Sequence, residues 1–143
     1  MKGERRMIYN KIAFQADPFS YDLVFEDRIT LVGGDSGTGK TVLYDMLEDL
    51  KQTEEYNAIK LFNYKSEDVL EKLKQCRNNF VVIDNADILL DDYTRKYISL
   101  DDKNQYLIIG RNPRNLFATR ENLYELKSEK IGEQTKFTIK EYL

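Results

Sequence analysis

A loop able to hold a phosphate group is the strongest chemical feature of the sequence. Residues 34–41 match the pattern G-x-x-x-x-G-K-[ST] in full. Its glycines let several backbone N–H groups point at one anion. Its lysine can reach the β- and γ-phosphates of a nucleotide, and its last hydroxyl can ligate Mg²⁺. The residues predicted to bind the nucleotide are Gly34, Asp35, Ser36, Gly37, Thr38, Gly39, Lys40, Thr41 and Val42.

A second motif predicts a partner for this loop. Phe80–Ile83 is a run of four apolar residues, and Asp84 follows it directly. A carboxylate at the end of a strand beside a phosphate loop can hold the phosphate-bound Mg²⁺, usually through water. The sequence therefore predicts Thr41 and Asp84 as the metal ligands. The alternative for Asp84 is an ordinary solvated aspartate at a strand end.

Strands and helices must bring these groups together. Short apolar runs predict four strands, at residues 29–32, 58–62, 80–83 and 106–109. Helical spacing of apolar residues predicts helices after Thr41 and Ser66 and a short one within 88–98. Turn signals between β-rich runs predict hairpins at both ends of the chain. We therefore expect an α/β P-loop fold of three layers over residues 1–143 as a single domain. It would have a mainly parallel central sheet, flanking helices and peripheral β-hairpins.

The two motifs are separated by one strand and one helix, over residues 58–76. This arrangement resembles the additional-strand division of P-loop NTPases, which includes the AAA-type and RecA-like ATPases. The resemblance covers residues 29–112 and only the phosphate-site motifs are specific. It implies ATP with Mg²⁺, and the Asn-Lys-x-Asp motif that reads guanine in G proteins is absent. Without a recognisable lid domain, the chain resembles a minimal core of that division.

The residues expected to act in catalysis are Lys40, Asp87 and Arg111. Hydrolysing members of the division carry Glu directly after the metal-holding Asp, whereas this chain has Asn85. An amide can orient water but cannot accept its proton. Asp87 is a candidate base, with a helix N-cap as its alternative role. The resemblance also implies a polar residue near the γ-phosphate after the strand at 106–109, where Arg111 or Asn112 stands.

Three functions fit these residues. The leading one is a Mg·ATP-binding domain with weak or partner-dependent ATP hydrolysis. The second is a nucleotide-switched binding module without hydrolysis, which Asn85 in place of Glu motivates. The third is a small-molecule kinase, in which Arg111, Arg114 and Arg120 would clamp a second phosphorylated substrate.

Composition limits the partners. The chain has 143 residues with 22 Lys and Arg against 25 Asp and Glu, a net charge of −3, so charge does not indicate nucleic acid. It has no His and one cysteine, Cys76, which excludes imidazole catalysis and an internal disulfide. No signal peptide or membrane span is recognised, so we expect a cytoplasmic protein. The expected partners are ATP and either another protein or further copies of this chain, because ATPases of the resembled division often share an arginine between neighbours.

Overall fold

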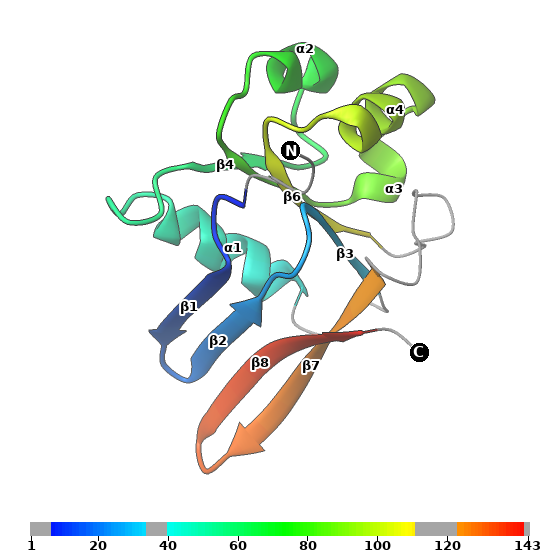
Figure 1. Ribbon diagram of the computed structural model, residues 1–143. Coiled ribbons are helices and arrows are strands. Elements are labelled where there is room, and N and C mark those ends of the chain that lie inside the picture. Colours follow the sequence, from blue (N-terminus) through cyan, green and yellow to red (C-terminus); the bar gives the residue numbers. More distant parts are fainter. Residues whose placement is uncertain (1–6, 34–39, 111–122, 142–143) are drawn as a thin grey trace.

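One curled sheet organises the molecule (Figure 1). The computed structural model describes residues 7–33, 40–110 and 123–141. Within them, the eight strands are β1 (Lys11–Ala16), β2 (Phe19–Val24), β3 (Ile29–Gly33), β4 (Ile59–Phe62), β5 (Phe80–Ile83), β6 (Gln105–Ile109), β7 (Leu123–Ile131) and β8 (Gln134–Glu141). The four helices are α1 (Lys40–Leu50), α2 (Val69–Lys74), α3 (Ala86–Leu89) and α4 (Asp92–Leu100).

The sheet mixes parallel and antiparallel pairing. Its strand order is β1-β2-β8-β7-β3-β6-β5-β4. The pairs from β7 to β4 are parallel. The hairpins β1–β2 and β7–β8 are antiparallel, and β8 lies parallel to β2. The two hairpins therefore supply four neighbouring strands, which is half of the sheet.

The expected fold class, a three-layer α/β P-loop fold with peripheral hairpins, is wrong. The hairpins are not peripheral, because β2 pairs with β8 and β7 pairs with β3 to make one continuous mixed sheet. The sheet curls, with the blue and orange-red hairpins turned under α1 (Figure 1). Strands dominate, and the longest described helix, α1, has 11 residues. Sequence patterns located each strand but carried no information on which strands would pair.

Aromatic side chains explain why the hairpins join the sheet. The Tyr21 ring stacks on Phe14 at 4.9 Å and on Phe137 at 4.6 Å between ring centroids. These three residues come from β1, β2 and β8 and lie opposite one another in the strand register. Tyr21 and Phe137 are buried. Because cross-strand aromatic pairs stabilise a sheet and bury large apolar areas, this row favours pairing of the two hairpins over leaving either one apart.

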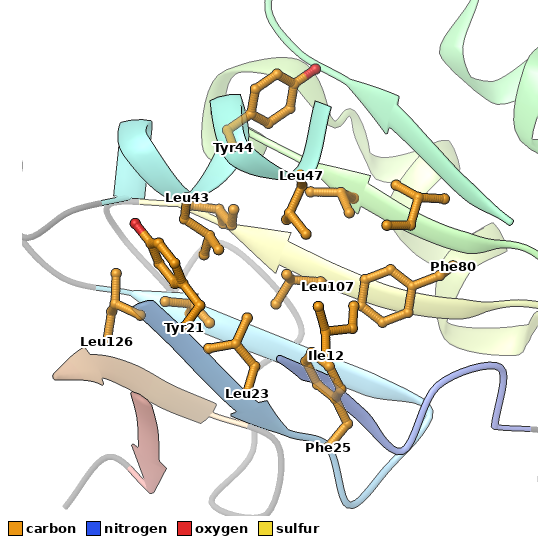
Figure 2. Close-up of a cluster of buried hydrophobic side chains, with 14 of the residues drawn as sticks. Ile12, Tyr21, Leu23, Phe25, Leu43, Tyr44, Leu47, Phe80, Leu107 and Leu126 are labelled. Atoms are coloured by element: carbon orange, nitrogen blue, oxygen red, sulfur yellow. The ribbon is translucent and has the colours of Figure 1, made fainter. Parts of the chain in front are cut away.

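The hydrophobic core divides into two clusters. In the first, Leu43 and Leu47 of α1 are fully buried against Leu23 and Ile12 of the first hairpin and Leu107 of β6 (Figure 2). The second cluster joins β5 and β6 to residues of α2, α3 and α4, among them Leu73, Ala86 and Ile98. Every residue of β3, β5 and β6 is buried, as a strand covered on both faces should be.

A buried polar network closes the amino ends of β5 and β6. The Asp101 carboxylate accepts hydrogen bonds from the Tyr106 hydroxyl at 2.6 Å, the Asn104 amide at 2.8 Å and the Lys103 N–H at 2.9 Å. Asn104 also bonds the Cys76 carbonyl and the Asn79 N–H, each at 3.0 Å. Burial alone would raise the pKa of Asp101, but these hydrogen bonds outweigh it and hold the pKa below its ordinary value.

Candidate functional site

The site is built where parallel strands end together. Strands β3, β6, β5 and β4 run in parallel, so their carboxyl ends share one edge of the sheet. Residues 34–39 follow β3, and α1 begins directly after them at Lys40. Asp84 follows β5, and its N–H donates to the Phe62 carbonyl of β4 at 2.9 Å. The predicted lysine and aspartate are therefore carried to the same edge by different strands.

The Lys40 ammonium and the Asp84 carboxylate act on each other electrostatically. Burial raises the pKa of Asp84, while a hydrogen bond from the Asn85 N–H at 2.9 Å and the positive charge of Lys40 oppose that rise. The negative charges of Asp45 and Asp87 raise it further, and the net shift is upward. The Asp84 carboxylate is therefore half-buried in surroundings that penalise its negative charge. Such surroundings are common for groups that bind cations or take part in a reaction.

Several predicted site residues lie outside the described part of the chain. These are Gly34, Asp35, Ser36, Gly37, Thr38 and Gly39 of the loop, together with Arg111, Asn112, Arg114 and Arg120. The backbone of Thr41 belongs to α1, but its side chain is also outside the description. The half-buried side chain of Val42 packs against the first hydrophobic cluster, so any nucleotide contact it makes comes from its backbone.

The N-cap position of α3 is occupied by Asn85 and not by Asp87. Asn85 has φ 54° and ψ 41°, the left-handed conformation, and stands at the N-cap position of α3. Asparagine adopts this conformation more readily than most residues. The alternative role of Asp87 as the N-cap is therefore wrong, because Asp87 lies in the first turn of α3. Its charge reaches Asp84, so it stays a candidate base at the site.

Ser66 also departs from expectation. Its hydroxyl accepts the Asn63 N–H at 2.9 Å, and its own N–H donates to the Asn63 carbonyl at 2.8 Å. It therefore closes a turn after β4 and does not cap α2, whose N-cap position is Asp68. This turn fixes Asn63 at the same sheet edge as Asp84.

Sequence analysis did not predict two residues near this edge of the sheet, Tyr44 on α1 and Asn63 directly after β4. Tyr44 stands one helical turn after Lys40 on α1, a spacing that puts both on one face. Burial, together with the charges of Glu48, Asp84 and Asp45, raises the pKa of Tyr44 to about 12. The i, i+4 spacing from Lys40 and the position of Asn63 directly after a strand were the available signals.

The described residues hold no group of three or more His, Cys, Asp or Glu side chains placed to bind a metal ion. Asp84, to which the sequence assigns the metal role, lies directly after β5 at the carboxyl edge of the sheet. None of the helices in the described ranges has the length and apolar character needed to cross a membrane.

The chain matches no protein-family model, and a search of the curated proteins finds no similar sequence.

Proposed function

We propose that the chain binds Mg·ATP at the carboxyl edge of β3 and β5 and hydrolyses it weakly or with the help of a partner. The observation that carries the proposal is the placement of Lys40, at the start of α1 after β3, and Asp84, directly after β5, at the same edge of the sheet. Both belong to the two motifs that predict a phosphate and its ion. Lys40 would contact the β- and γ-phosphates, and Asp84 would face the cation.

The chemistry of the donor set fits magnesium. Mg²⁺ prefers oxygen ligands, keeps several of its waters, and is held in nucleotide sites by one or two protein oxygens plus phosphate. A single half-buried carboxylate at Asp84, with the hydroxyl of Thr41, which directly follows Lys40 in the sequence, would supply that number. When bound, the ion would neutralise charge on the phosphate oxygens.

Asn85 favours slow hydrolysis. It directly follows Asp84, and its carboxamide can orient a water but cannot take the proton. Asp87, and Arg111 for charge on the γ-phosphate, stay as candidate catalytic residues. The same observation favours a second candidate function, in which nucleotide binding switches the contact with a partner and little ATP is turned over.

Binding of a fluorescent ATP analogue with and without Mg²⁺ tests the proposal. We expect Lys40→Ala to weaken binding about tenfold to hundredfold, because a charge-assisted contact to phosphate is lost. Lys74→Ala, an exposed lysine on α2, is the matched control and should bind like the parent. Equal binding by Lys40→Ala and the parent would show that the proposal is wrong.

An ATPase assay at increasing protein concentration separates the two candidate functions. Specific activity that rises with concentration indicates a site shared between copies of the chain. Turnover that stays flat and close to zero, with binding intact, favours the switch.

A further inference from the structure

Strand β1, dark blue in Figure 1, forms one edge of the sheet. Within the described ranges it pairs with β2 alone. The Phe25 N–H donates to the Asn10 carbonyl at 2.9 Å, which marks Asn10 as a hydrogen-bonded position of this antiparallel ladder. Because such positions alternate along the strand, the backbone groups of Lys11, Ala13 and Gln15 point away from β2. These three residues are exposed, so the outer side of β1 is open.

The opposite edge of the sheet, at β4, is protected. Strand β4 has four residues. The Ile59 N–H at its start donates to the Tyr56 carbonyl at 3.3 Å, and the Asn63 N–H directly after its end donates to the Ser66 hydroxyl at 2.9 Å. In the described part of the chain, no hydrogen bond engages the three outward N–H groups of β1. Natural sheets usually protect such edges, so β1 is available to pair with another strand.

The inner face of β1 carries the open end of an aromatic row. The Tyr21 ring stacks on Phe137 at 4.6 Å and on Phe14 at 4.9 Å between ring centroids. Tyr21 and Phe137 are buried, whereas Phe14 of β1 is half-buried. In the described sheet, the row stops at Phe14 because β1 is the last strand. An added strand with an aromatic residue opposite Phe14 would continue the row and gain a stabilising cross-strand pair.

The sequence of β1 is complementary to a second copy of itself. Two antiparallel β1 strands can pair with Phe14 opposite Phe14 of the second copy, a position without hydrogen bonds, where side chains approach most closely. The outward backbone groups of Ala13 then meet those of Gln15 of the second copy. The same register sets Lys11 opposite Asp17 of the second copy, on one face of the sheet. Opposite charges in that position favour pairing.

We propose that the chain forms a symmetric dimer through β1, in which two sheets join edge to edge with Phe14 opposite Phe14 of the second copy. The inference does not rest on the proposed function, because it uses neither Lys40 nor Asp84. A contact centred on two six-residue strands is small compared with the interfaces of stable complexes. The dimer should therefore form at micromolar or higher concentrations and dissociate on dilution.

Sedimentation equilibrium at a series of protein concentrations tests the proposal. We expect the mass of the parent to rise from 16.9 kDa toward twice that value. Ala13→Pro removes an N–H that faces the open side, so hydrogen bonds are lost from the dimer and none from the β1–β2 ladder. It should raise the dissociation constant about tenfold to hundredfold. Ala13→Val keeps the N–H, suits a strand and should dimerise like the parent.

Two results of this experiment would overturn the proposal. One is a parent that stays monomeric at every concentration. The other is an Ala13→Pro variant that dimerises as well as the parent, since the copies would then meet elsewhere.

Exchange of charges tests the register and covers the case in which the proline variant does not fold. In their own dimers, Lys11→Asp sets two carboxylates opposite each other and Asp17→Lys sets two ammonium groups opposite each other. Each variant alone should therefore have a dissociation constant about threefold to tenfold above that of the parent. When the two variants are mixed, opposite charges face each other again, and the mixture should associate more tightly than either variant alone.

Mixing also separates this effect from damage within each chain. Lys11→Asp loses the contact with Asp22, and Asp17→Lys loses the hydrogen bonds from Gln15 and Gln134. Mixing would not restore those contacts. A mixture that associates no more tightly than the separate variants would contradict the register and overturn the proposal.

Discussion

Two aspartates at opposite ends of β5 and β6 are held in contrasting ways. At the amino ends, Asp101 is 3% exposed and accepts three hydrogen bonds, from Tyr106, Asn104 and the Lys103 N–H. At the carboxyl ends, Asp84 is half-buried and accepts the Asn85 N–H. The pKa of Asp101 is lowered by its hydrogen bonds in spite of burial, whereas burial raises the pKa of Asp84.

The contrast separates a structural carboxylate from one available for binding. Asp101 is satisfied by the protein itself and joins the end of α4 to the start of β6. Asp84 lacks that support, so a cation or a bound ligand could lower the cost of its charge. Surface exposure alone would predict the wrong order of the two pKa values, since Asp101 is the less exposed of the two and has the lower pKa.

The largest expected effect breaks the amino-end network. Asp101→Asn replaces an acceptor of three hydrogen bonds with a group that can accept fewer of them, leaving buried donors without partners. We expect the free energy of unfolding at neutral pH to fall by about 2–4 kcal/mol, measured by urea denaturation. The exposed neighbour Asp102→Asn is the control. Equal stability of the two variants would mean that the network contributes nothing.

A smaller effect is expected at the other end, and on binding instead of stability. Asp84→Asn removes the carboxylate that we propose faces the cation. The magnesium gain, which is the ratio of the dissociation constants of an ATP analogue in EDTA and in excess Mg²⁺, should therefore fall about tenfold to hundredfold, which is about 1.4–2.7 kcal/mol. Its stability should not decrease, because burial penalises the charge that is lost. Asp101→Asn, assayed below its melting temperature, should keep the gain. A reversed pattern, with Asp84→Asn unstable and binding normally, would remove the distinction.

The smallest effect is a difference in pH dependence. The pKa of Asp101 is lowered on folding, so its stabilisation is present above the ordinary carboxyl pKa of about 4 and is lost as pH falls through the lower folded value. The pKa of Asp84 is raised, so on acidification its carboxylate takes up a proton at a higher pH in the folded protein than in the unfolded chain. Acidification from neutral pH therefore removes the free-energy cost of burying its charge.

Urea denaturation at a series of pH values from neutral to acidic would measure how the free energy of unfolding depends on pH in the parent and in each variant. On acidification, the parent should lose stability relative to Asp101→Asn and gain it relative to Asp84→Asn. Slopes of the same sign in both comparisons would contradict the assignment. The other acidic residues are shared by the parent and each variant, so their contributions cancel in each comparison.

Local patterns predicted the elements of this protein well. The hairpins at both ends are confirmed, and so are the strands that contain residues 29–32, 80–83 and 106–109. The helix after the loop is confirmed as α1. These predictions succeeded because apolar periodicity and turn residues act over a few positions. The phosphate loop itself and Arg111 stay predictions, since they lie outside the described residues.

Predictions that depended on partners far along the chain were less successful. The hairpins looked peripheral because no local pattern shows that Tyr21 stacks on Phe137, which follows it by more than a hundred residues. A local prediction failed too: Ser66 looked like a helix cap, but it bonds Asn63, three residues before it, instead.

The sequence by itself determined the chemical groups and the local elements, because the residue types of the loop at 34–41 and the apolar run before Asp84 depend on nothing outside those segments. Only the tertiary structure decided the pairing of the hairpins, the curl of the sheet, and the contrasting surroundings of Asp84 and Asp101. Those depend on contacts between distant strands, which bury aromatic rings in one place and leave a carboxylate with little hydrogen bonding in another. Such contacts follow from the balance of burial and hydrogen bonding over the whole chain, which no short pattern contains.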